Sequence, residues 1–281
     1  MSIHRRGLFH GALGLSAGLI GWRGVATAEA AAPFTLAPLR AAGLDPFEVY
    51  IKMFASMAAG AECAWWFMGA LPREVEDVGP VDTIQEETVR VHRTDRVDRG
   101  RLEFIWKEVG VFRDIRTGEN PPERFDPVTG RSTKGLTRLG GSAPAARVAV
   151  ERAGDGLNVG MEIEGNTVSN VRVGATLDGD RVCLTHLEDK TRARPLGGMA
   201  PTNTTSFKIY ASLGDLRGQE PSVAATGFYG VRNRDTGKIF VNGLAHKAAL
   251  DDRVNPIAWG RLQAAHPGFF KGDRLGPDWK D

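Results

Sequence analysis

The chain has 281 residues, of which 25% are charged and 42% are hydrophobic, and its formal net charge is +2 at pH 7. Arg5, Arg6, Arg23 and Glu29 account for that +2, so the chain after residue 30 is close to neutral. A neutral chain lacks the excess positive charge that drives binding to nucleic acid, which is therefore excluded as an expected partner. Residues 31–281 are long enough to bury a full core, and we expect them to form a single mainly-β domain.

Residues 1–30 have the three-part layout of a removable signal peptide. A basic segment carries adjacent Arg5 and Arg6, an apolar stretch runs from Leu8 to about Trp22, and small residues over 26–30 offer two cleavage sequences. The paired arginines favour the twin-arginine (Tat) export machinery as a partner, and an ordinary secretory peptide is the alternative. Either route leads out of the cytoplasm, and we expect a periplasmic protein. The apolar stretch is too short and too rich in glycine to make a stable membrane anchor.

The first helix is expected over about 46–59. Asp45 followed by Pro46 is a typical helix start, with an N-cap and a proline at the first helical position. Phe47, Tyr50 and Phe54 then recur at helical spacing and form one apolar stripe.

The sequence pattern of the rest of the chain is typical of short strands separated by tight turns. Alternating or apolar segments occur over 63–68, 88–93, 101–107, 147–151, 158–164, 170–177, 182–187, 205–211, 224–232 and 238–244. Many short strands with close turns predict an antiparallel sheet that closes into a barrel or a sandwich. We expect the barrel-like form, similar to calycins and lipocalins. Residues 118–142 are expected to form a long loop, and a second helix is expected over about 255–266.

The segment from Leu102 to Asp114 holds the strongest candidate site. If one continuous strand runs through it, Trp106, Glu108 and Asp114 share a face. A carboxylate among aromatic side chains has its pKa raised by desolvation, so Glu108 and Asp114 are candidate general acids or bases. The alternative, which we favour, is a bulge at Gly110 that turns Asp114 outward and leaves Glu108 paired with an arginine.

His186 is a third acid/base candidate, because it shares a strand face with apolar residues and is expected to be buried. A buried histidine can also be a ligand or a core residue with satisfied hydrogen bonds, and the core role is the commonest. His92 lies on the face opposite the apolar side chains of its strand and is expected at the surface. Trp66, Trp106 and Arg113 are the candidate ligand-binding residues, and filling of the core is the alternative role for the aromatic ones.

The sequence identifies neither a metal site nor a cofactor. No two histidines have the close spacing of a metal site, so no metal is expected. The glycines over 154–160 bracket a hairpin turn, which does not fit a dinucleotide-binding loop, and the cofactor is therefore unknown. Cys63 and Cys183 either pair in an oxidising compartment or are both buried as small apolar residues.

Four segments taken together resemble a bacterial family known as domain of unknown function eighteen thirty-eight. They are Trp65-Trp66-Phe67-Met68-Gly69, the run from Lys107 to Asp114, Asp126-Pro127-Val128-Thr129-Gly130, and Asn255-Pro256-Ile257-Ala258-Trp259. The resemblance implies Tat export, which many members share. It implies no activity and supplies no catalytic residues.

These features predict an exported protein that binds a small apolar or aromatic molecule in a β-barrel cavity. One form of this hypothesis is a cofactor-independent lyase, isomerase or hydrolase, with Glu108, Asp114 and His186 as acid/base candidates and Trp66 and Trp106 as walls. The alternatives are a carrier without chemistry and a structural or interaction module. Turnover of a substrate separates the enzyme from the carrier, whereas a barrel packed solid with side chains favours the module.

Overall fold

The computed structural model of the protein describes most of the chain after the expected signal peptide. The described residues are 34–75, 79–119, 124–126, 131–133, 138–139, 146–163, 166–168, 171–191, 199–218, 226–234, 237–250, 253 and 255–270. The expected signal peptide lies outside them.

Strands dominate the described chain, and four short helices accompany them. The strands are β1 (Glu62–Val75), β2 (Gly79–Asp98), β3 (Arg101–Asp114), β4 (Arg124–Asp126), β5 (Arg131–Thr133), β6 (Arg138–Leu139), β7 (Ala146–Ala153), β8 (Gly156–Ile163), β9 (Asn166–Val168), β10 (Val171–Asp178), β11 (Arg181–Thr191), β12 (Met199–Ser212), β13 (Thr226–Arg234) and β14 (Gly237–Ala248). The helices are α1 (Ala37–Ala41), α2 (Pro46–Phe54), α3 (Leu213–Arg217) and α4 (Pro256–Ala265).

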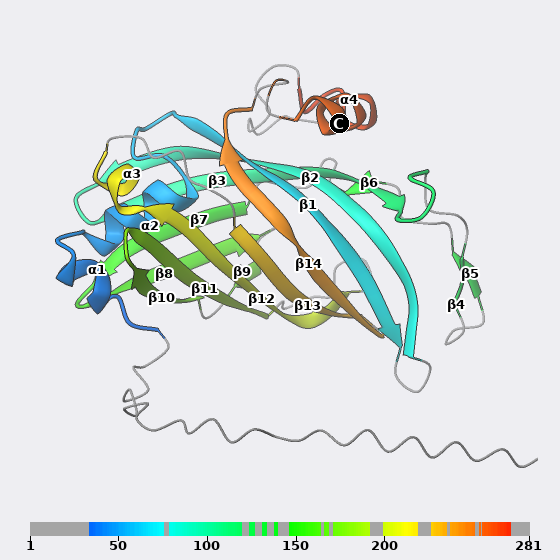
Figure 1. Ribbon diagram of the computed structural model, residues 1–281, viewed down its shortest axis with the longest axis horizontal. Helices are drawn as coiled ribbons and strands as arrows, with labels where there is room; N and C mark the ends of the chain where they lie inside the picture. Colours follow the sequence, from blue (N-terminus) through cyan, green and yellow to red (C-terminus); the bar gives the residue numbers. More distant parts are fainter. Residues whose placement is uncertain are drawn as a thin grey trace, which may run out of the picture. The chain divides into compact units, whose positions relative to one another are not determined.

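One large antiparallel sheet contains twelve of these strands (Figure 1). Its path runs β10-β11-β12-β13-β14-β1-β2-β3-β7-β8-β9, and β6 pairs with β3 off this path. Most neighbours in the sheet are neighbours in the chain, but the first strand, β1, pairs with the last, β14. Within the described residues no ladder joins β9 to β10, so the described sheet is not a closed barrel. The expected mainly β, antiparallel architecture is confirmed.

The prediction of one long loop over 118–142 is wrong in part, because short strands occur within this range. Strands β4 and β5 pair with each other there as a separate two-stranded sheet. Strand β6 adds Arg138 and Leu139 to the side of β3. These strands have only two or three residues each, which is too few for an alternating pattern to be visible in the sequence.

Helix α2 begins where the sequence indicates its start. The side chain of Asp45 accepts a hydrogen bond from the backbone N–H of Phe47 at 3.1 Å, and Pro46 occupies the first helical position. The helix ends at Phe54, before the end of the expected range, because Ala55 leaves the helical conformation.

Side chains of the sheet hold the C-terminal end of α2. The carbonyl oxygen of Phe54 accepts hydrogen bonds from Trp65 Nε1 at 3.0 Å and from His92 Nδ1 at 2.7 Å. The ammonium group of Lys247 donates to the carbonyl of Ala55. The last carbonyl groups of a helix lack partners within the helix and carry partial negative charge, so these donors both satisfy and stabilise the helix end.

The two faces of the sheet are covered by different helices. The face that packs against α1 and α2, called the α2 face here, carries a large apolar cluster that includes Trp65, Phe104 and Leu184. The opposite face, called the α4 face, carries a smaller cluster that includes Trp66 and packs against Leu262 of α4. Because both faces are covered over β1 to β3, these strands are buried on both sides and lack a simple alternating pattern.

Helix α4 is fixed to the sheet by polar contacts as well as by apolar packing. Asn255 caps its first turn by accepting from the backbone N–H of Ala258 at 3.2 Å. Arg261 pairs with the buried carboxylate of Glu87 on β2. Just after the helix, His266 Nε2 lies 2.9 Å from the carbonyl oxygen of Gly110 on β3.

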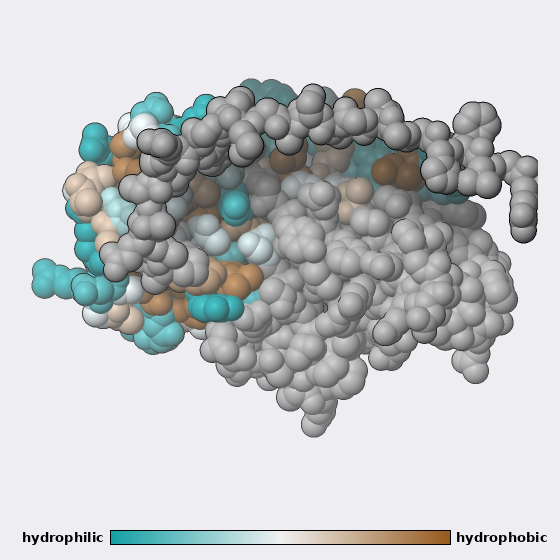
Figure 2. Space-filling view, turned by 60° about the horizontal axis from the view of Figure 1, so that its bottom comes forward, coloured by the Kyte–Doolittle hydropathy of each residue, from teal (hydrophilic) through white to brown (hydrophobic). Residues whose placement is uncertain are grey.

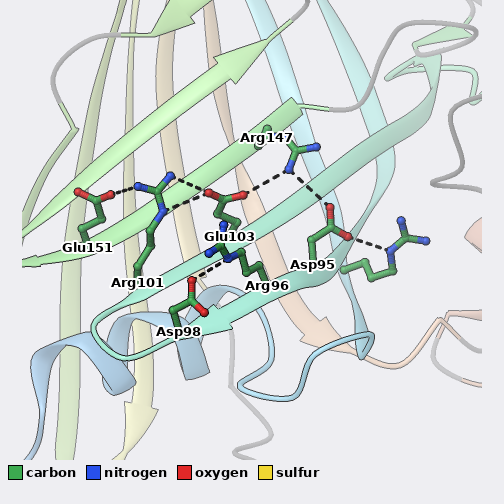
Figure 3. A network of polar contacts seen from close by, with 8 residues as sticks. Asp95, Arg96, Asp98, Arg101, Glu103, Arg147 and Glu151 are labelled. Carbon is green, nitrogen blue, oxygen red and sulfur yellow. Dashed lines mark hydrogen bonds and ion pairs between the residues drawn. The ribbon is translucent and has the colours of Figure 1, made fainter.

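A chain of charged side chains joins β2, β3 and β7 (Figure 3). Arg101 bridges Glu103 and Glu151, and Arg147 contacts both Glu103 and Asp95. Positive and negative side chains alternate along the network. The side chains of Arg101 and Arg147 are 45% and 53% exposed. Exposed pairs of this kind contribute little to stability, and their charges cancel, so we assign the network no ligand-binding role.

The described surface is mixed in character. Figure 2 shows apolar (brown) and polar (teal) side chains interspersed over the described part of one face. No helix in the described part of the chain is long and apolar enough to cross a membrane. Cys63 is buried on β1 and Cys183 is half-buried on β11, and no disulfide bond joins them.

The two roles of Asp45 can be separated by mutation. It caps α2 and pairs with Arg152. We expect Asp45→Ala to lower the free energy of unfolding by about 1 kcal/mol more than Asp45→Asn, because Asn keeps the capping oxygen and loses only the ion pair. Urea denaturation of both variants tests this, and equal losses would show that the cap contributes nothing.

Gly243 of β14 lies opposite Gly69 of β1 at a very close approach of the two backbones. A Cβ at position 243 would lie 2.6 Å from the carbonyl oxygen of Met68. We expect Gly243→Ala to cost roughly 1–3 kcal/mol of stability through overpacking. The matched control is Gly260→Ala in α4, where a Cβ would meet nothing within 4 Å. That change should leave stability equal or slightly raised, and similar thermal shifts in the two variants would contradict the prediction.

Candidate functional site

Ionisable side chains line the α2 face beyond the C-terminal end of α2. They are Glu86, Arg90 and His92 of β2, Glu108 of β3, and His186 and Glu188 of β11. Most are buried, with Glu86, His186 and Glu188 only 1–3% exposed. Burial of ionisable groups is costly, so their collection on one face distinguishes this region from an apolar core.

Arg90, Glu108 and Trp106 form one unit of this region. Arg90 lies directly opposite Glu108 in the β2–β3 ladder and donates from Nε to its Oε2 at 2.7 Å. The guanidinium group also lies 4.1 Å above the centre of the Trp106 ring. The Arg90 and Glu108 side chains are 25% and 14% exposed, so this pair is accessible from solvent.

The ladder decides between the two interpretations of β3. Its register is unbroken from the Ile84–Asp114 pair to the Thr94–Phe104 pair, so no bulge occurs at Gly110. The favoured alternative is therefore wrong about the bulge, although it is right that an arginine pairs with Glu108. Residues 106, 108 and 114 share the α2 face, as a continuous strand requires.

Asp114 closes the turn that follows β3. Its Oδ1 accepts from the backbone N–H groups of Arg116 at 2.8 Å and Thr117 at 3.2 Å, and its Oδ2 lies 3.3 Å from the Arg116 guanidinium. The hydrogen bonds from the Arg116 side chain and backbone hold the pKa of Asp114 below its ordinary value. Asp114 is thus an ionised turn residue, which is a poor general acid at neutral pH.

His186 lies on the α2 face, inside a group of aromatic rings. It stacks on Phe207 with ring centres 5.5 Å apart and meets Phe54 edge-on at 4.9 Å. Its Nε2 is 3.7 Å from a carboxylate oxygen of Glu188. Burial, and then the charge of Glu188, raise the pKa of Tyr50 of α2 well above its ordinary value, so this phenol stays protonated. A carboxylate beside an imidazole is an arrangement that can take up and release a proton.

His92 is buried, which corrects the expectation that it lies at the surface. It packs against Phe104 with ring centres 5.2 Å apart, and its Nδ1 faces the Phe54 carbonyl. Burial, followed by the charge of Arg90, lowers the pKa of His92 well below its ordinary value, so the ring is neutral. The expectation failed because α2 and α4 cover both faces of β2 at this point.

The three candidate ligand-binding residues lie on different faces. Trp106 lies on the α2 face, partly exposed, with the ionisable group. Trp66 lies on the α4 face, where its ring is 6.2 Å from that of Trp259 and its Nε1 donates to the carbonyl of Ala249 at 3.2 Å. Arg113 alternates with the α2-face residues of β3 and so belongs to the α4 face. Trp66 and Arg113 therefore do not line the same space as Trp106.

Several residues of this region were not assigned to the candidate site from the sequence. Glu188 could have been found, because it follows His186 by two positions in a strand and so shares its face. Arg90 and His92 alternate with buried valines, a pattern that also fits an exposed face. Tyr50 forms part of an apolar helical stripe and carries no sequence signal for a polar role.

A second candidate region lies at the other end of α2. A cleft of about 290 Å³ is lined by Arg40, Asp45, Phe47, Arg152 and Leu157, among others. Arg152 is committed there, because it pairs with Asp45 and lies 4.6 Å above the ring of Phe47. In the part of the chain that the structure describes, no three His, Cys, Asp or Glu side chains are placed to hold a metal ion.

Comparisons with known proteins leave the function open. No family model matches the chain, and no curated protein matches it. A solved structure of a hypothetical protein from Chlamydia trachomatis is 6% identical, with a TM-score of 0.22, over 72% of this chain and 93% of that one. The siderocalin Ex-FABP is 10% identical, with a TM-score of 0.17, over 78% of this chain and 91% of its own. Scores this low establish no shared fold, so function is argued from the site alone.

The lowered pKa of Asp114 predicts how stability changes in acid. A carboxyl group with a depressed folded pKa stabilises the protein above its unfolded pKa, which is about 3.9, and this stabilisation is lost as the pH falls through the folded value. We expect Asp114→Asn to unfold at lower urea concentration than the wild type at pH 7. The difference should begin to shrink as the pH falls below about 4 and should vanish below the folded pKa. A difference that persists unchanged in acid would show that it does not arise from the charge.

Proposed function

We propose that the protein binds a small molecule with an apolar or aromatic body on the α2 face of its sheet, beyond the end of α2. The observation that carries this proposal is the collection of buried ionisable side chains on that face, beside partly exposed aromatic rings. A face that only filled a core would carry apolar side chains there, because unneeded buried charges are costly. Small-molecule sites combine apolar walls with a few fixed polar groups in this way.

The sheet is proposed to curl into a barrel-like, calycin- or lipocalin-like cup. The pairing of β1 with β14 supports this, because it joins the two ends of an up-and-down meander. The ends of the sheet path also approach each other, since residues of β8 and β10 have Cα atoms within 8 Å. Helix α2 would close one end of such a cup and leave the ionisable region as its interior.

The exposure of aromatic side chains supports a ligand surface in this position. Residues that pack under α1 and α2, such as Leu102 and Leu184, are fully buried. On the same face, Phe67 and Trp106 are only partly buried, and so is Phe207, whose ring meets that of Phe54 at the end of α2. Flat aromatic surfaces with partial exposure provide the contact area that an apolar ligand would cover.

His186 and Glu188 are the proposed acid/base pair if the protein is an enzyme. Their separation of 3.7 Å allows the carboxylate to orient the imidazole and to stabilise it when protonated. Glu108 is proposed to act indirectly, because it already holds Arg90 over Trp106. Such a site suits proton transfer in a cofactor-independent lyase, isomerase or hydrolase. A carrier without chemistry is the alternative, and unchanged ligand after saturable binding would favour it.

Export is proposed from the sequence alone. The paired Arg5 and Arg6 and the cleavage sequences over 26–30 support transport by the Tat machinery to the periplasm. Detection of the processed chain in a periplasmic fraction, and its loss when Arg5 and Arg6 are both changed to Lys, would test this.

A fluorescent apolar probe can test the ligand surface. We expect anilinonaphthalene sulfonate to bind saturably, and Trp106→Leu to weaken its binding about tenfold, or ~1.4 kcal/mol, through loss of the aromatic contact. Trp259→Leu is the matched control, because this tryptophan lies against Trp66 on the α4 face. It should leave the Kd unchanged within roughly twofold.

Urea denaturation of both variants shows whether either change acts through stability. Equal loss of probe binding in the two variants, or binding that never saturates, would contradict a ligand surface at Trp106.

A further inference from the structure

The hydrogen bond between His92 and Phe54 fixes the tautomer of a buried imidazole. His92 Nδ1 lies 2.7 Å from the Phe54 carbonyl oxygen. That oxygen carries no hydrogen, so Nδ1 must be the protonated nitrogen in this contact. In the neutral ring the other nitrogen, Nε2, is then a hydrogen-bond acceptor with a free lone pair.

The Nε2 atom of His92 is buried without a partner. No hydrogen-bond donor reaches it from the described part of the chain, and the residue is only 4% exposed. A buried acceptor without a donor costs free energy, and most such atoms in proteins are satisfied. The structure therefore maintains an acceptor whose direction is set by the bond on the opposite side of the ring.

The surroundings of His92 restrict which donor can reach it. Its ring lies 5.2 Å from that of Phe104 and 6.5 Å from that of partly exposed Trp106, which favours a flat partner. The charges of Arg90 and Lys247 act on the imidazole and disfavour its positive form, and they would repel a protonated amine in the same way. A carboxylate has no hydrogen to donate. Neutral O–H and N–H groups remain as donors, and of these we choose the hydroxyl group, the simplest donor that an aromatic ring carries.

We propose that His92 Nε2 accepts a hydrogen bond from a neutral hydroxyl group on an aromatic ligand whose ring lies against Trp106. This rests on the proposed function, because it assigns the polar recognition of that ligand. The binding role of His92 is to select for the hydroxyl group, and the Phe54 carbonyl positions the ring for this role. The ligand class is thus a hydroxylated aromatic molecule.

Phenol and anisole are the probes for this proposal. They have the same ring, and only phenol has a hydrogen to donate. We expect phenol to bind the purified protein about fivefold more tightly than anisole, or ~1 kcal/mol. In ¹⁵N spectra of the histidine rings, His92 should show a protonated Nδ1 and an unprotonated Nε2, and phenol alone should shift the Nε2 signal.

His92→Asn removes the acceptor while keeping a donor near the position of Nδ1. We expect phenol and anisole to bind this variant equally. His246→Asn is the matched control, since His246 lies opposite Trp66 and thus on the α4 face, and it should keep the preference for phenol. The ring spectra of the wild type test the proposal independently if the His92 variant does not fold.

The outcomes separate this proposal from the broader one. Preference for phenol in the wild type and its loss only in His92→Asn support the hydroxyl site. Equal binding of phenol and anisole to the wild type, or an Nε2 that is already protonated, overturns the hydroxyl site and leaves the ligand surface standing. Failure of phenol, anisole and the fluorescent probe to bind at all overturns both.

Discussion

The carbonyl oxygen of Phe54 is the contact on which the interior of this protein depends. It ends α2, and it accepts hydrogen bonds from Trp65 of β1 and His92 of β2. The Phe54 ring meanwhile meets His186 of β11 edge-on. One residue therefore links strands from separate parts of the sheet, and it does so where a helix has unsatisfied carbonyl groups to offer. The partial negative charge of the helix end also favours the ammonium group of Lys247 close by.

This contact divides the α2 face into an apolar part and an ionisable part. Under the helices the side chains are apolar and buried, and they stabilise the fold through their burial. Beyond Phe54 the strands carry Arg90, Glu108 and Glu188 toward the same side. Here each charge has a counter-charge or a ring beside it, and the polar groups are oriented by the strands that carry them. A rigid framework of this kind suits recognition or proton transfer.

The class of fold and part of the candidate site could be predicted from the sequence. The remaining predictions failed for physical reasons. A continuous β3 requires Glu108 and Asp114 to share a face, and they do, although the favoured prediction was a bulge at Gly110 that would have separated them. Alternation did not reveal that Asp114 is tied into a turn, since that depends on residues that follow the strand. His92 was misplaced because both faces of β2 are covered, so alternation no longer separates core from surface. The role of Phe54 involves its backbone, which sequence patterns do not report.

The pairing of β1 with β14 has a consequence for how the chain folds. The partners Trp65 and Lys247 are far apart in sequence, and Lys247 is also a donor to the end of α2. Neither the β1–β14 ladder nor this anchor of the helix can form until the chain has been synthesised through β14. Contacts of such long sequence separation are slow to form. The β1–β14 ladder and the Lys247 contact are therefore expected to form late in folding, after the strands between them.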